Sequence, residues 1–142
     1  MPEKVIHILL VEDDDIDIMN VKRAFKKNNV QNPLTVAEDG LKALEMLKSL
    51  KANNEPVPKI ILLDLNMPRM GGIEFLTELR KDEELKDISV FVMTTSSEET
   101  DIVDAYRLNV AGYIVKPLSI EQFINAVSTL NNYWTLCEYP NC

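Results

Sequence analysis

The sequence predicts a doubly wound α/β fold, in which helices cover both faces of a five-stranded parallel sheet. Five short apolar runs recur along the 142-residue chain, at residues 5–11, 34–38, 59–64, 88–94 and 111–117. Longer segments with helical spacing separate them. Runs as continuously apolar as "IILL" and "VFVM" are typical of strands buried on both faces, and their alternation with helices is typical of a parallel sheet.

Apolar residues at intervals of three and four predict the helices that follow the first, second and fifth runs. The residues are Ile18, Val21 and Phe25; Leu41, Leu44, Met46 and Leu47; and Ile120, Phe123, Ile124, Val127 and Leu130. A further helix is expected in "SEETDIVDAYRLN", after the fourth run. The polar segment 48–59, "KSLKANNEPVPK", predicts a loop that leaves the second helix.

Prolines support the predicted strand boundaries, because proline removes a backbone donor and restricts the residue before it. Pro33 opens the second strand, Pro56 and Pro58 precede the third, and Pro117 closes the fifth.

The composition is that of one soluble globular domain, with 46% apolar and 27% charged residues. No apolar run reaches the roughly 18 residues of a membrane span, and the N-terminus lacks a basic leader with a cleavage pattern. We therefore expect a cytoplasmic protein without membrane contact. The 15 basic and 23 acidic residues give a formal net charge of -8. This charge argues against a nucleic-acid partner, because phosphate backbones are bound by a positive face.

The cysteines and the histidine predict neither a disulfide framework nor a zinc site. Cys137 and Cys142 lie at the end of the chain, and the single histidine, His7, is far from them in sequence. Two thiolates do not complete a tetrahedral zinc site. We expect reduced thiols, with pairing between molecules as the alternative, and a structural role for His7.

Reactive side chains follow four of the predicted strands. The carboxyl ends of parallel strands meet at one edge of the sheet, and ligands bind there in folds of this class. Glu12 and Asp13 follow the first run, Asp64 ends the third, Thr94 ends the fourth and Lys116 lies near the end of the fifth. We therefore expect these residues to share a pocket.

Three carboxylates in one pocket require a cation. Two like charges roughly 4 Å apart repel by about 4 kcal/mol at an effective dielectric constant of about 20. An open group of carboxylate oxygens favours Mg²⁺, which keeps several of its waters, over an enclosed Ca²⁺ site. Such a pocket could accept a phosphoryl group, with Asp64 as nucleophile, Lys116 neutralising phosphoryl oxygens and Thr94 donating a hydrogen bond.

Each of these residues also has a simpler structural interpretation. Asp64 could cap a helix or form a turn, and Lys116 could be an ordinary surface lysine. The acidic run Glu12–Asp15 could stabilise the first turn of a helix. We assign that role to Asp14 and Asp15, whereas the alignment of strand ends favours the shared pocket for the others.

Four motifs, "VEDD", "LLDLNMPRMGG", "VMTT" and "GYIVKP", occur in the order and spacing of a known family. Residues 4–131 resemble the receiver domain of two-component response regulators, in particular its chemotaxis-regulator-like members. The resemblance implies a flavodoxin-like sheet with strand order 2-1-3-4-5. It also implies that a sensor histidine kinase or a phosphotransfer protein phosphorylates Asp64. The protein would then be no ordinary enzyme, but a phosphoacceptor that assists its own Mg²⁺-dependent phosphorylation and dephosphorylation.

The resemblance further implies a metal site and a switch. The implied metal ligands are Glu12, Asp13, Asp64 and the backbone carbonyl of Asn66. Thr94 would be the switch hydroxyl, and Tyr113 the aromatic residue whose rotamer follows it; alone, Tyr113 is more typical of a strand aromatic packed on the sheet. Lys116 would pair with the phosphoryl group and precede a cis bond to Pro117.

Two positions depart from the family pattern. Glu12 stands where many members have Asp, and we expect its longer side chain to reach the metal through a water. Thr95 stands where a small residue, often Ala, is usual. Its bulk beside the phosphoryl site could slow attack by water, so the lifetime of the phosphorylated state is left open.

Other functions are less well supported. A phosphatase of the haloacid dehalogenase type also uses a strand-end Asp with Mg²⁺, but it needs a general acid two residues later, where this chain has Asn66. A nucleotide-binding module would carry GxGxxG or GxxxxGK[ST], and neither motif occurs. A receiver that binds partners without being phosphorylated is the third alternative.

Residues 1–131 are predicted to form the receiver domain, and residues 132–142 a C-terminal tail without an output domain. The output would then be a phosphorylation-dependent binding surface near Tyr113, recognised by an unknown downstream protein. The tail is unusually apolar. We expect it either to fold back on its own domain or, together with the last helix, to form the contact of a homodimer. The tail and the loop before the third strand are similar to stand-alone receivers that serve phytochrome-like histidine kinases.

Overall fold

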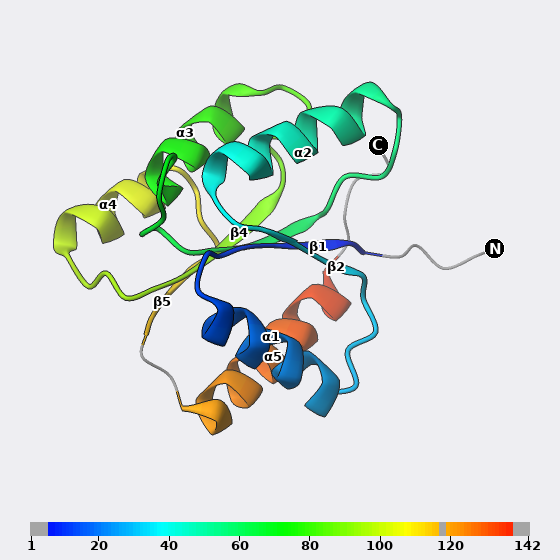
Figure 1. Ribbon diagram of the computed structural model, residues 1–142, viewed down its shortest axis with the longest axis vertical. Helices are drawn as coiled ribbons and strands as arrows, with labels where there is room; N and C mark the ends of the chain where they lie inside the picture. The colour runs from blue at the N-terminus through cyan, green and yellow to red at the C-terminus, as the bar shows by residue number, and fades with distance from the viewer. Residues whose placement is uncertain (1–5, 117–118, 138–142) are drawn as a thin grey trace. The chain divides into compact units, whose positions relative to one another are not determined.

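The computed structural model describes residues 6–116 and 119–137. Strands and helices alternate through these ranges (Figure 1). They are β1 (Ile8–Val11), α1 (Asp15–Lys27), β2 (Leu34–Ala37), α2 (Gly40–Ala52), β3 (Ile60–Leu63), α3 (Gly72–Lys81), β4 (Ser89–Thr94), α4 (Glu99–Arg107), β5 (Gly112–Val115) and α5 (Ile120–Leu136).

The described strands form one parallel sheet in the order β2-β1-β3-β4-β5. Every side chain of β1 and β3 is buried, as their uninterrupted apolar sequences predict. The predicted fold class and strand order are confirmed.

Element ends differ from the predicted ones by a few residues. The strand predicted over 111–117 covers only Gly112–Val115, and Pro117 lies outside the described residues. The loop predicted from residue 48 begins later, because α2 continues to Ala52. Lys48 and Ser49 lie on the exposed side of that helix, where polar residues are as common as in a loop.

The chain divides into two compact units, and the first contains the sheet with α2, α3 and α4. These three helices lie on the same side of the sheet in Figure 1. Their buried side chains form one hydrophobic cluster with alternate residues of the strands, including Leu9, Val11, Ile61, Leu63, Val90, Val92, Leu47, Phe75, Leu76, Leu79 and Ala105. A close-packed core therefore positions the carboxyl ends of the strands.

One half-buried arginine joins loops of this unit. The Arg80 guanidinium donates to the carbonyls of Lys86, Ile88, Leu108 and Asn109. These bonds connect the end of α3 to the loops on either side of β4 and α4. Burial lowers the pKa of Arg80 from its ordinary value, and the four carbonyl acceptors keep the charged group satisfied.

The second unit consists of α1 and α5 with their flanking residues. Asp14 caps α1, and Ser119 forms a capping box with Gln122 at the start of α5. The rings of Phe25 and Trp134 lie 6.1 Å apart, and Trp134 is fully buried. Residues 132–136 of the predicted tail therefore belong to α5.

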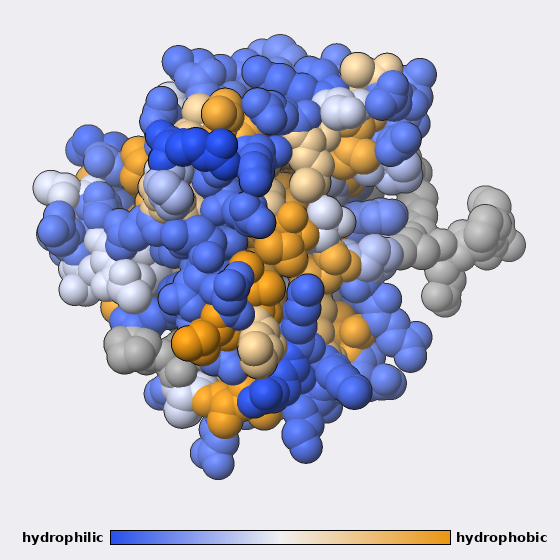
Figure 2. All heavy atoms as spheres, viewed as in Figure 1, coloured by the Kyte–Doolittle hydropathy of each residue, from blue (hydrophilic) through white to orange (hydrophobic). Residues whose placement is uncertain are grey.

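The face of the molecule in Figure 2 is mostly hydrophilic, with hydrophobic residues visible in smaller groups. The described large hydrophobic side chains that are exposed include Ile16, Met19, Val103, Tyr106, Val115, Tyr133 and Leu136. Leu136, at the end of α5, is 84% exposed. No helix within residues 6–116 and 119–137 has the length and apolarity to cross a bilayer.

Candidate functional site

The register of the sheet brings the predicted site residues together. Val11 pairs with Leu63, and the Asp64 amide donates to the Val11 carbonyl over 3.0 Å. Glu12 and Asp64 are therefore neighbours at the carboxyl edge of the sheet. At the other end of the same edge, the Lys116 amide donates to the Thr94 carbonyl over 2.7 Å.

Three acidic side chains form a cluster at this edge. One carboxylate oxygen from each of Glu12, Asp13 and Asp64 lies within 4.8 Å of the other two. Glu12 and Asp64 are buried, whereas Asp13 is exposed. Oxygens around an octahedral Mg²⁺ lie about 3 to 4 Å apart, so a small contraction or a bridging water would complete the site. The donor set, all hard carboxylate oxygen with one open side, fits Mg²⁺.

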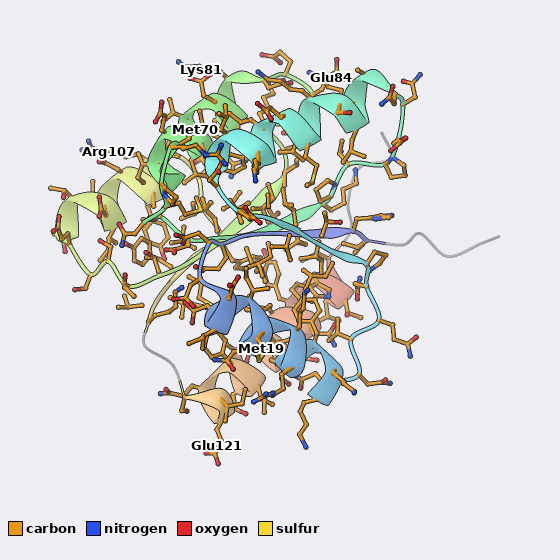
Figure 3. All side chains as sticks on the ribbon, viewed as in Figure 1. Met19, Met70, Lys81, Glu84, Arg107 and Glu121 are labelled. Carbon is orange, nitrogen blue, oxygen red and sulfur yellow. The ribbon has the colours of Figure 1, made fainter. Side chains whose placement is uncertain are left out.

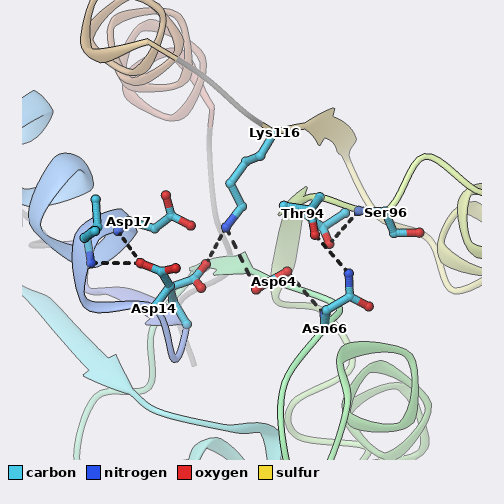
Figure 4. A network of polar contacts seen from close by, with 10 residues as sticks. Asp14, Asp17, Asp64, Asn66, Thr94, Ser96 and Lys116 are labelled. Atoms are coloured by element: carbon cyan, nitrogen blue, oxygen red, sulfur yellow. Dashed lines mark hydrogen bonds and ion pairs between the residues drawn. The ribbon is translucent and has the colours of Figure 1, made fainter.

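Lys116 supplies the positive charge of the pocket. Its side chain is buried, and its ammonium lies 2.9 Å from a Glu12 oxygen and 3.9 Å from an Asp64 oxygen (Figure 4). Because buried carboxylates need a partner charge, the lysine stabilises both of them. The interpretation of Lys116 as a surface residue is wrong, since it is only 5% exposed.

Asp64 directly precedes the β3–α3 loop, which comprises residues 65–71. One Asp64 carboxylate oxygen accepts a hydrogen bond from the Asn66 amide over 3.2 Å, which forms an Asx-turn. Asp64 thus does form a turn, but it caps no helix, because the N-cap of α3 is Gly71. The loop then closes tightly, with the Gly72 amide bonded to the Leu65 carbonyl.

The β4–α4 loop, residues 95–98, is organised by hydroxyl groups. The buried Thr94 hydroxyl accepts a hydrogen bond from the Ser96 amide over 3.3 Å, and Tyr113 donates to the Ser96 carbonyl over 2.9 Å. The Ser96 hydroxyl bonds Asp101 in α4 over 2.5 Å. Burial raises the pKa of the Tyr113 hydroxyl, so it stays protonated as a donor at neutral pH. Thr94 and Tyr113 are thus linked through Ser96.

The two loops contact each other beside the pocket. The Asn66 side-chain amide donates to the Thr95 hydroxyl over 3.2 Å. Thr95, the unusual residue noted in the sequence, therefore has an interaction partner in the loop that follows Asp64.

A second set of contacts, which sequence reasoning missed, holds the β3–α3 loop from the side of α2. Asp39 caps α2 with one carboxylate oxygen, 2.9 Å from the Lys42 amide, and its other oxygen accepts a hydrogen bond from Arg69. Burial raises the pKa of Asp39, but the hydrogen bonds from Lys42 and Arg69 outweigh burial and hold the pKa below its usual value. The Gly40 amide donates to the Met70 carbonyl over 3.1 Å. Asp39 and Gly40 follow a strand, in a pattern that is typical of a helix start. The sequence could therefore have indicated the capping role of Asp39, but not its pairing with Arg69.

The remaining predictions have mixed outcomes. Asp14 caps α1 and Asp15 lies in its first turn, as expected. His7 precedes β1 and is half-buried. Cys137 is a free thiol, whereas Cys142 and the predicted cis bond to Pro117 fall outside the described residues.

The sequence matches the family described as "response regulator receiver domain" over residues 8–128. Response regulator Rcp1 of Synechocystis sp. is 37% identical over 134 residues, which cover 94% of this chain and 90% of Rcp1.

Solved structures are similar over nearly the whole chain. The phosphorylated cyanobacterial phytochrome response regulator RcpA superposes with a TM-score of 0.87 at 34% identity, covering 97% of this chain and 100% of that one. The Mn²⁺-bound form of response regulator Rcp1 gives a TM-score of 0.82 at 34% identity, covering 95% and 98%.

Proposed function

This chain belongs to the response regulator receiver domain family, and from that premise we propose that Asp64 is the residue that accepts the phosphoryl group. Members of the family are signalling regulators phosphorylated on an aspartate by histidine kinases. The observation that carries the assignment is the buried pocket in which Lys116 lies within 3.9 Å of Asp64, beside the acidic cluster.

In the proposed transfer, an Asp64 carboxylate oxygen forms a bond to phosphorus. The phosphorus–nitrogen bond of the donor's phosphohistidine breaks, and its electron pair returns to the imidazole. Dephosphorylation follows when a water attacks phosphorus, which releases inorganic phosphate and restores the carboxylate. Both steps require the donor or the water to approach the open side of the pocket, where Asp13 is exposed.

The metal ligands we propose are Glu12, Asp13, Asp64 and the carbonyl of Asn66. Mg²⁺ bound there would neutralise charge and orient the phosphoryl oxygens. Lys116 must then exchange its Glu12 partner for a phosphoryl oxygen, a short movement because its ammonium already lies between Glu12 and Asp64.

Phosphorylation is proposed to reach the surface through Thr94. In the present arrangement the Thr94 hydroxyl accepts from the Ser96 amide. Turning that hydroxyl toward a phosphoryl oxygen would break the bond and free the β4–α4 loop, to which Tyr113 and Asp101 are tied. The proposed output is an altered surface around α4 and β5 that a downstream protein recognises.

Intact-mass measurement after incubation with acetyl phosphate and Mg²⁺ tests the assignment of Asp64. We expect one added phosphoryl group on the native protein and none on Asp64→Asn, which keeps the size of the side chain. Omitting Mg²⁺ should abolish the modification. Addition at another residue would overturn the assignment, and release of many phosphates per protein from simple phosphomonoesters would indicate a hydrolase instead.

A phytochrome-like histidine kinase is the proposed donor, because RcpA, at 34% identity, is described as a phytochrome response regulator. Radiolabel should move from such an autophosphorylated kinase to the native chain faster than to an unrelated receiver. Equal rates for the two receivers would contradict this pairing.

We also propose that residues 1–131 act as the receiver and that the end of α5, with the tail, can form a homodimer. Leu136 and Tyr133 expose apolar surface there, although Trp134 between them is buried. Leu136→Asp is the matched probe, because Leu136 is exposed and its loss should not disturb the helix pair. Sedimentation should show a dimer for the native chain and a monomer for Leu136→Asp, whereas a monomer in both would refute the dimer.

A further inference from the structure

We propose that Arg69 is a positioning residue for the metal site, which sets the path of the β3–α3 loop by pairing with Asp39 at the start of α2. The inference rests on the proposed function of this edge of the sheet. It assigns a role to two residues that belong neither to the acidic cluster nor to the switch.

The first support is the fixed position of Asp39. Its side chain is only 2% exposed, and one oxygen is engaged as the cap of α2. The other oxygen accepts from Arg69, whose side chain is 54% exposed and reaches inward to this single carboxylate. A buried carboxylate that loses its partner charge is costly, so the pair constrains where residue 69 can lie.

The second support is the backbone of Arg69 itself. Four non-glycine residues of the described chain have a positive φ, and three of them are asparagines: Asn29, Asn54 and Asn109. Asparagine tolerates this conformation, whereas a residue such as arginine adopts it at a cost of about 1 kcal/mol or more. The fourth is Arg69, with a φ of 64°. An unfavourable backbone persists only where surrounding contacts hold it, and the Asp39 pair is such a contact.

The third support is the bond next to the ion pair. Gly40 donates its amide to the Met70 carbonyl, and a Cβ on Gly40 would lie 2.8 Å from that oxygen. The backbone segments at Gly40 and Met70 therefore meet at a distance that only glycine permits. Met70 is labelled in Figure 3, where it lies near the start of α2.

These contacts leave little conformational freedom for the residues that follow Asp64. The loop is held at Asp64 by the sheet and at Arg69 and Met70 by α2. Only four residues, 65–68, lie between these points. If Arg69 relaxed to a negative φ, the peptide planes before it would rotate, and this rotation would displace the carbonyl of Asn66, a proposed metal ligand. Contacts that orient a ligand typically change metal affinity about tenfold or more.

The experiment compares Mg²⁺ binding by isothermal titration calorimetry in four proteins: native, Arg69→Ala, Arg69→Asn and Lys51→Ala. Arg69→Ala removes the ion pair and disfavours the positive φ. Arg69→Asn also removes the ion pair, but keeps a residue that accepts this backbone conformation. Lys51→Ala is the matched control, because Lys51 pairs with Asp82 over 2.8 Å and joins α2 to the end of α3 away from the pocket.

We expect Arg69→Ala to weaken Mg²⁺ binding about tenfold, Arg69→Asn to weaken it clearly less, and Lys51→Ala to leave it unchanged. Phosphorylation of Arg69→Ala by acetyl phosphate should be slow at limiting Mg²⁺ and should recover at saturating Mg²⁺. Hydrogen exchange should be faster at the amides of residues 66, 67, 69 and 70 in Arg69→Ala only.

Native affinity in Arg69→Ala would overturn the inference, and so would equal losses in Arg69→Ala and Lys51→Ala, which would indicate a general effect of stability. A native protein that is not phosphorylated but binds Mg²⁺ would refute the proposed function. The comparison of variants would still test whether Arg69 positions the β3–α3 loop for the metal. A native protein that binds no Mg²⁺ would overturn the metal assignment and this inference with it.

Discussion

The two loops that flank Asp64 are held by different kinds of contact. The β3–α3 loop is fixed by close backbone approach at Gly40 and Gly72 and by the buried charge of Asp39. The β4–α4 loop is held by single hydrogen bonds from the hydroxyls of Ser96 and Tyr113 and to the hydroxyl of Thr94. The first loop carries a proposed metal ligand, and the second a proposed switch.

The difference shows how one pocket can be both precise and mobile. A backbone packed against backbone has no alternative position of similar energy, so it suits a ligand that must stay in place. A hydroxyl can exchange one acceptor for another at small net cost, because a hydrogen bond contributes only about 1 kcal/mol. Four substitutions, each with its measurement, test this contrast in order of decreasing effect on stability.

Gly72→Ala should have the largest effect. A Cβ there would lie 2.7 Å from the Asp64 carbonyl oxygen and 2.7 Å from the Leu65 Cα, and neither backbone atom can move aside easily. We expect a loss of about 2 to 3 kcal/mol in the free energy of unfolding, measured in urea. Gly71→Ala is the control, since its Cβ would meet only the Leu65 carbonyl, at 3.3 Å. Equal losses would show that the close approach at Gly72 is not what fixes the loop.

Asp39→Asn should cost about 1 kcal/mol at pH 7, because asparagine keeps the helix cap but loses the ionic partner of Arg69. The pKa of Asp39 is lower in the folded protein than in the unfolded chain. Its contribution is therefore complete above the unfolded pKa of about 3.9 and is lost as pH falls through the folded pKa. The stability difference between native and variant proteins should shrink below pH 4, and a difference independent of pH would contradict the ion pair.

Ser96→Ala should cost less than about 1 kcal/mol, although it loosens the β4–α4 loop. The Ser96 hydroxyl bonds Asp101 and also accepts from the Glu98 amide, at a helix start whose N-cap residue, Glu98, makes no side-chain capping bond. Hydrogen exchange should become faster at the first amides of α4 and stay unchanged in residues 66–71. Faster exchange in both loops would mean that they are not independent.

Thr95→Ala should have the smallest effect on stability, within about 0.5 kcal/mol, because Thr95 is exposed and bonds only Asn66 among the described contacts. It removes bulk and the hydroxyl contact between the two loops. We expect phosphate release from phosphorylated Asp64 to become faster by a few fold, measured from the decay of the added mass. An unchanged decay rate would show that Thr95 does not affect the lifetime of the phosphorylated state.

Local patterns were enough to predict the sheet and its reactive edge. Apolar runs identify the strands, and parallel pairing alone brings Asp64, Lys116 and Glu12 to one edge. The roles of Asp39, Arg69 and Ser96 were not predictable in this way. They depend on loop conformations, such as the positive φ of Arg69, and on partners 30 residues apart.

The last helix extends further than the predicted boundary at residue 131. Trp134 follows Leu130 by four residues and so continues the apolar spacing of α5, a signal that the predicted boundary at residue 131 did not use. Packing of Trp134 against Phe25 of α1 then stabilises this last part of the helix.

The placement of the single tryptophan has an optical consequence. Trp134 lies against Phe25 in the α1–α5 pair, and its indole N–H bonds the Asn131 side chain over 2.9 Å. Its emission spectrum therefore reports on the interior of that helix pair, whereas Asp64, the proposed phosphoacceptor, belongs to the other unit. A shift in emission upon modification of Asp64 would be a label-free sign that the event in one unit is sensed in the other.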